Sequence, residues 1–213
     1  MGKFFNSRFF EGISKATDLV LIGFYFLVCS IPVFTLGASA TAMYYAVHKS
    51  VFKGRGYTTE FFHSFKENFK QATLSWLIFI AVIAILCGDI FITKNITGDA
   101  NLATMAPAFF TVLLIFAILW AIYHFAYIAR FENSFSSSLK VSAVFMIANL
   151  GWTAIILGIL VVGVLAIYRF PILFIFAPGL ITAAIHPILE RVFKKYMSPE
   201  DLEKESQIYD DII

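Results

Sequence analysis

Charged residues are scarce in this chain, and their scarcity limits the class of protein it can be. Only 14% of its 213 residues are Asp, Glu, Lys or Arg, whereas 60% are hydrophobic. Soluble domains carry about 25% charged residues, so this composition does not supply a water-soluble surface. The chain also lacks a long polar insert that would form a separate soluble domain. We therefore expect one membrane domain that binds no nucleic acid.

Cysteine and the common catalytic motifs are equally sparse. The two cysteines, Cys29 and Cys87, lie in apolar segments without metal-ligand spacing, so they provide no disulfide framework. The chain has no G-x-x-x-x-G-K-[ST] loop for ATP, no H-E-x-x-H and no G-x-S-x-G. It also has no regular arginine ladder of the kind that senses voltage. The sequence predicts that the protein is not an enzyme, with no catalytic residues and no cofactor.

Long apolar segments are what the sequence does contain. A helix needs about 20 mostly apolar residues to span a bilayer core, and the backbone of a lipid-spanning segment must satisfy its own hydrogen bonds. We expect an all-α polytopic bundle with five full spans and a short or re-entrant second segment. Residues 1–197 would form a single transmembrane domain, followed by an acidic cytoplasmic tail over 198–213. The expected membrane segments are 17–34, 36–52, 74–93, 107–128, 141–167 and 171–189.

The distribution of basic residues predicts the orientation of these segments. Threading the chain through six segments places all 16 Lys and Arg residues except Lys94 and Arg169 on one side. Because cytoplasmic loops carry the excess of basic residues, both termini are expected in the cytoplasm. Residues 1–40 also resemble a cleavable signal peptide. Cleavage there would export five basic residues of 41–73 against the charge rule, so we expect the segment to be retained.

A break between the first two segments is the strongest local signal. Pro32 lacks a backbone donor and disfavours helix at the preceding residue, and Gly37 tolerates the backbone angles of a tight turn. We expect Gly37 to Ala42 to be buried against other helices, because small residues allow close helix contact. Thr35 or Ser39 should hydrogen-bond the carbonyls freed by the break. A plain hairpin turn and a substrate site are both open here; the binding candidates are Pro32, Thr35, Gly37, Ser39 and Thr41.

Three histidines form a second candidate constellation. His48, His124 and His186 each lie about four residues before the cytoplasmic end of a segment, hence at similar depth. Imidazoles that converge can bind a metal or relay protons, whereas amphipathic side chains also anchor helices at membrane interfaces. The only obvious acid nearby is Glu190, one helical turn beyond His186. Depth alone does not establish convergence, so the three histidines are binding candidates and no metal site is predicted.

Two further features concern the ends of the third segment. Asp89 is a binding candidate close to the outer surface, where Arg169 is its expected structural partner. Before the span, four phenylalanines of 61–70 share one helical face while the charged residues face away. That pattern predicts an amphipathic helix lying in the inner membrane interface. A partner-binding helix shows the same pattern and is the alternative.

Residues 31–42, IPVFTLGASATA, strongly resemble the YesL family of bacterial membrane proteins, a domain family of unknown function. The resemblance continues in FKENFKQA at 65–72, and length and hydropathy match over nearly the whole chain. The family occurs mainly in Gram-positive bacteria, often encoded beside carbohydrate-uptake ABC transporters and glycan-degrading enzymes. No catalytic or ligand residues are established for it, so none are carried over.

The resemblance implies a protein of the bacterial plasma membrane that takes part in carbohydrate uptake. The chain lacks an E-A-A-type ATPase-docking loop, so the role implied is an accessory component of oligosaccharide ABC-type uptake rather than the permease itself. Its expected partners are the lipid bilayer, ABC sugar transporter subunits and a second copy of the chain. The alternative is a small stand-alone transporter or channel that uses the broken helix at Pro32 to Gly37.

Overall fold

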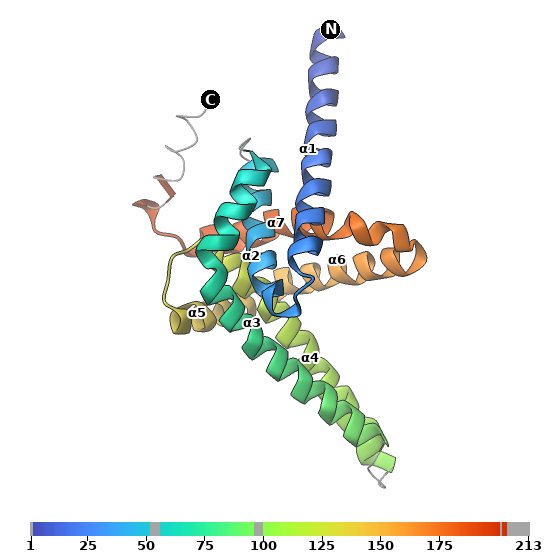
Figure 1. Cartoon of the computed structure of the whole chain (residues 1–213). Helices are drawn as coiled ribbons and strands as arrows, with labels where there is room; N and C mark the ends of the chain where they lie inside the picture. Colours follow the sequence, from blue (N-terminus) through green and yellow to red (C-terminus); the bar gives the residue numbers. More distant parts are fainter. Residues whose placement is uncertain (1, 52–55, 96–99, 201, 204–213) are drawn as a thin grey trace.

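A computed structural model describes residues 2–51, 56–95, 100–200 and 202–203, and within these ranges it contains helices and no strand (Figure 1). The described residues form seven α-helices with three short elements between them. The α-helices are α1 (Gly2–Cys29), α2 (Leu36–Ala46), α3 (Tyr57–Asn95), α4 (Ala100–Ile128), α5 (Phe135–Ala148), α6 (Leu150–Arg169) and α7 (Ala177–Tyr196). The short elements are the 3-10 helices η1 (Val33–Thr35) and η3 (Pro171–Ile175) and the π-helical turn η2 (Val47–Val51).

Four of these helices are long and apolar enough to cross a membrane, namely Gly12–Cys29 within α1, α3, Ala103–Ile128 within α4, and α6. Large apolar side chains stand on their outer faces, as lipid contact requires. The expected class of an all-α, multi-pass membrane protein is confirmed. The expected segments 36–52 and 171–189 do not belong to this set. The helix α2 has only 11 residues, and α7 ends in a charged stretch.

The expected fifth segment, 141–167, is not one span. The chain leaves the helical conformation at Asn149, where φ is −127° and ψ is 46°. This residue separates α5 from α6, and its side-chain amide donates a hydrogen bond to the carbonyl of Phe145 at 2.9 Å. Asparagine readily bonds to nearby backbone in this way, which competes with helix continuation. Apolar composition alone did not reveal the break.

The expected interfacial helix over 61–70 is instead the first part of α3. A 39-residue helix is about 58 Å long at 1.5 Å per residue, well beyond a hydrocarbon core of about 30 Å. Phe61 is completely buried and packs with Leu19, Ile22 and Ala46. The aromatic face is therefore partly a packing surface within the protein, and Phe61 does not reach lipid as the prediction of an interfacial helix required.

Two helical hairpins diverge from a common centre formed around α2. In Figure 1 the α3–α4 hairpin points one way and the α6–α7 hairpin another. The helix α2 packs against α1, α3, α4 and α7. Glycines allow α1 to cross α7 closely, since a Cβ built on Gly23 would lie 3.2 Å from the backbone nitrogen of Gly179. This arrangement brings side chains from α2, α4 and α7 together inside the protein.

Candidate functional site

The break before α2 is sealed by its own hydrogen bonds. The Thr35 hydroxyl lies 2.5 Å from the Cys29 carbonyl oxygen and 2.6 Å from that of Pro32. The indole Nε1 of Trp76 donates to the carbonyl of Val33 at 2.7 Å. Backbone carbonyls that lose their helical partner need such donors wherever the chain contacts lipid rather than water. The expected role of Thr35 at the freed carbonyls is confirmed.

The stretch after the break is a packing contact, as expected from its small residues. Gly37, Ala38, Ser39, Thr41 and Ala42 are all buried. A Cβ on Gly37 would lie 2.6 Å from both the Ala72 carbonyl oxygen and Trp76 Cβ. The hydroxyls of Ser39 and Thr41 donate to the carbonyls of Thr35 and Gly37, one turn back in the chain, at 3.1 and 3.0 Å. The hydroxyls of both candidate residues therefore already donate hydrogen bonds to backbone carbonyls.

Polar side chains from three parts of the chain meet beside α2, and we call them the buried polar cluster. Its members are Tyr44 of α2, His48 of η2, Arg130 directly after α4, and His186 and Glu190 of α7. His186 and Glu190 stand four residues apart, which places them on one face of α7. His48 sits in a π-helical turn, a conformation found frequently at functional sites. The histidines and Glu190 are at most 7% exposed.

One carboxylate oxygen organises this cluster. Arg130 Nε donates to Glu190 Oε1 at 2.8 Å, and the Tyr44 hydroxyl donates to the same atom at 2.9 Å. His48 Nδ1 lies 2.8 Å from His186 Nε2, within hydrogen-bond distance. The same His48 and His186 nitrogens lie 3.5 and 3.8 Å from Glu190 Oε1. An ion pair between the buried Glu190 carboxylate and the part-buried Arg130 guanidinium therefore lies directly beside a buried pair of imidazoles.

The third histidine does not join the other two. His124 is buried between α3, α4 and α5, where its Nε2 lies 2.7 Å from Ser75 Oγ and its Nδ1 lies 3.2 Å from Ser142 Oγ. It thus links three helices through hydrogen bonds. His48 and His186 do converge, as their similar predicted depth allowed. Depth alone did not show that His124 lies on another side of the bundle.

Asp89 also stands apart from the buried polar cluster. Within the described residues no ion pair joins it to Arg169, whose guanidinium instead lies 5.1 Å from the centroid of the Phe170 ring. Figure 1 shows that α3 and α6 lead away from each other. Asp89 lies near the C-terminal end of α3, and Arg169 is the last residue of α6. The expected Asp89–Arg169 pairing was wrong because the hairpins diverge.

Sequence reasoning left three members of the cluster, Tyr44, Arg130 and Glu190, out of the set of binding candidates. Arg130 counted only among the basic residues expected on the cytoplasmic side, and Glu190 only as the acid one helical turn beyond His186. The spacing of Glu190 from His186 was the one available signal, since an acid four residues from a buried histidine shares its helical face. Nothing local marks Arg130, because its contact with Glu190 spans 60 residues of sequence.

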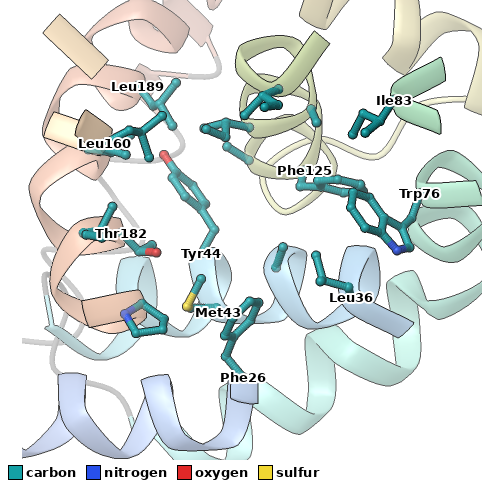
Figure 2. A pocket seen from close by; sticks show the side chains of 18 residues that line it. Phe26, Leu36, Met43, Tyr44, Trp76, Ile83, Phe125, Leu160, Thr182 and Leu189 are labelled. Carbon is teal, nitrogen blue, oxygen red and sulfur yellow. The ribbon is translucent and has the colours of Figure 1, made fainter. Parts of the chain in front are cut away.

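An apolar cavity of about 360 Å³ adjoins the cluster (Figure 2). It lies between the diverging hairpins, with α1 and α2 contributing to its wall. The Tyr44 ring crosses it, and its hydroxyl points toward the side where Leu160 and Leu189 lie. Most other lining residues are aliphatic or aromatic, among them Phe26, Met43, Ile83 and Phe125. Tyr44 therefore contacts both the cavity and Glu190.

A family model described as "Protein of unknown function, DUF624" matches residues 19–90. The matched stretch holds the break, α2 and His48, whereas Arg130, His186 and Glu190 lie outside it. The match covers less than half of the chain and is compatible with the resemblance of residues 31–42 to the YesL family. No curated protein and no solved structure matches the chain.

Proposed function

We propose that this protein is an accessory component of ABC-type oligosaccharide uptake in the bacterial plasma membrane, with both termini in the cytoplasm. In this role it assists the transporter without catalysis and without forming the sugar pathway. The carbohydrate part of the proposal rests on the resemblance of residues 31–42 to the YesL family. The accessory part rests on the structure, and the orientation rests on the distribution of basic residues.

The observation that carries the accessory role is the apolar character of the cavity. Oligosaccharides present many hydroxyl groups, and a protein that binds them must offer polar partners, since an unmatched buried polar group costs free energy. The side chains of Phe26, Ile83 and Leu160 in the cavity wall offer no polar partner for a sugar hydroxyl. A lipid chain or an apolar helix of a partner subunit fits such a space far better than a sugar does.

The same geometry supports a partner in the membrane. The far half of the α3–α4 hairpin exposes large apolar side chains, such as Ile85, Phe91 and Phe109, which are 60–65% exposed. Lipid covers such faces, and so can the helices of another subunit, because lipid and protein surfaces are equally apolar there. An accessory protein with two diverging hairpins therefore has surface available for transporter helices.

Co-purification tests the accessory role directly. The tagged full chain is extracted from its own cells in mild detergent, and ABC-transporter subunits are quantified by mass spectrometry against an unrelated tagged membrane protein. We expect a sugar permease and its ATPase to be enriched together with the chain. Recovery of the chain alone, in detergents that keep transporter complexes intact, would contradict the proposal.

The alternative of a small stand-alone transporter is favoured by one observation, the buried polar cluster. Intramembrane ionisable residues often mark ion or proton paths. In this alternative Glu190 and the histidine pair would carry protons while substrate used the break at Pro32 to Gly37. Purified protein in sealed vesicles with a pH-sensitive dye separates the two proposals. Proton flux that depends on Glu190 favours the transporter. Vesicles that leak protons no faster than protein-free vesicles favour the accessory role.

A further inference from the structure

We propose that His48, His186 and Glu190 form a binding site for a divalent transition-metal ion, with Zn²⁺ the best fit. The three residues each present one ligand atom, and these atoms lie within 4.8 Å of one another. They come from η2 and α7, which are far apart in the chain, so a bound ion would fasten these two elements together. The inference is independent of the accessory role.

The distances between the three ligand atoms fit zinc coordination. They form a triangle with sides of 2.8 Å between His48 Nδ1 and His186 Nε2, 3.5 Å between His48 Nδ1 and Glu190 Oε1, and 3.8 Å between His186 Nε2 and Glu190 Oε1. The point equidistant from the three atoms in their plane lies about 2.0 Å from each, which matches the usual length of Zn–N and Zn–O bonds. Tetrahedral binding of a fourth ligand would move the ion out of this plane and bring the three ligand atoms to more even separations. An ion placed there would replace the hydrogen bond between the two imidazoles.

The type of ligand also points to zinc. The two imidazoles are borderline ligands that suit Zn²⁺ better than Mg²⁺ or Ca²⁺, which prefer oxygen, and Zn²⁺ also accepts a carboxylate oxygen. Three protein ligands leave a fourth position for water or another small ligand. Zinc ligands usually have hydrogen-bonding neighbours that orient them. Tyr44 and Arg130 would hold the Glu190 carboxylate in this way, since both donate to Oε1.

Glu190 can serve the ion and these donors together. Its second oxygen, Oε2, is buried and makes no hydrogen bond in the structure. If the carboxylate turned so that Oε2 faced the ion, Oε1 would remain the acceptor for Arg130 and Tyr44, and the ion position would follow Oε2 rather than the Oε1 distances given above. Monodentate zinc carboxylates commonly have their second oxygen hydrogen-bonded in this manner.

Arg130 gives the site an unusual electrostatic feature. Its charge lies 2.8 Å from Glu190 Oε1 and already balances that carboxylate, so a divalent ion adds positive charge to a buried region. Repulsion between Arg130 and the ion lowers the affinity, and the fourth position should favour an anionic ligand such as hydroxide. The proposal thus predicts that removing the Arg130 charge, while keeping a hydrogen-bond donor to Glu190, makes Zn²⁺ bind more tightly.

Metal counting on the full chain tests the proposal. The purified protein is stripped with a chelator, loaded with Zn²⁺, freed of excess metal and analysed for zinc per chain. We expect about one Zn²⁺ per wild-type chain and little in His186→Ala or Glu190→Ala. His63→Ala is the matched control, because His63 pairs with Glu67 at the same four-residue spacing but is exposed. This control should retain the zinc, whereas equal loss in all three variants would overturn the assignment.

Two further measurements keep the proposal testable if a variant fails to fold. Co²⁺ added to the stripped wild-type chain should produce the intense visible absorption of a four-coordinate site, and Zn²⁺ should abolish it. Arg130→Gln should bind Zn²⁺ several-fold more tightly than wild type in a competitive titration. Absence of both stoichiometric zinc and Co²⁺ absorption in the folded wild-type chain overturns the proposal.

Discussion

Trp76 donates a hydrogen bond from its indole nitrogen to the backbone carbonyl of Val33 at 2.7 Å, and this bond ties the break in the chain to the middle of α3. The Thr35 hydroxyl contacts the carbonyl oxygens of Cys29 and Pro32 in the same region. Together these bonds give partners to backbone carbonyls at the point where helical hydrogen bonding stops. The break is thus a sealed hairpin turn that directs α2 into the centre of the bundle. Several of the following predictions depend on that structural role.

Replacing Trp76 with Phe should destabilise the fold by about 1 kcal/mol, the usual net value of one such hydrogen bond. The phenyl ring keeps the edge contact that the indole makes with Phe125, so the loss is mainly polar. Unfolding in mild detergent followed by circular dichroism measures the change. A variant as stable as wild type would show that the Val33 carbonyl needs no partner.

Gly37→Ala should destabilise the protein by about 1–3 kcal/mol, the range for overpacking a close contact. The added methyl would meet the Ala72 carbonyl and Trp76, neither of which can move without shifting α3. Gly88→Ala is the matched control on an open helix surface, where a Cβ meets nothing within 4 Å. It should be neutral or slightly stabilising, since Ala favours helix over Gly. Equal effects at the two positions would contradict the close packing of α2 on α3.

Thr35→Val should be more harmful than Ser39→Ala. The Thr35 hydroxyl serves carbonyls at the break, whereas Ser39 bonds only to a carbonyl one turn back in the chain. Comparing thermal unfolding and transport phenotype of the two variants tests this order, with Thr35→Ser as the rescue. Loss of function in a fully folded Ser39→Ala protein would instead indicate a substrate site.

Arg130→Met should cost about 3–5 kcal/mol, as is typical when one partner of a buried ion pair is removed. Glu190 would then remain buried without its cation. The double variant Arg130→Met with Glu190→Gln should recover part of that loss, because no unpaired charge remains. A double-mutant cycle measures the coupling, and simple additivity of the two single effects would contradict the ion pair.

Sequence patterns predicted those features that depend on local physics. The apolar runs indicated membrane helices, and Pro32 followed by small residues indicated a buried break, because both follow from chain composition within a few turns. The direction in which the hairpins lead was not predictable in this way. The direction of the hairpins determines that His48 contacts His186, whereas His124 contacts Ser75. It also separates Asp89 from Arg169. The π-helical turn at His48 and the break at Asn149 left no signal in hydropathy either.

Uptake of labelled oligosaccharide by intact cells tests the proposed function most directly. The gene is deleted, and the initial uptake rate is measured for each oligosaccharide that the parent strain imports through an ABC transporter. The account predicts that uptake of at least one of them falls and is restored by the wild-type chain but not by Gly37→Leu. Unchanged uptake of every such sugar, with full growth on each, would contradict it.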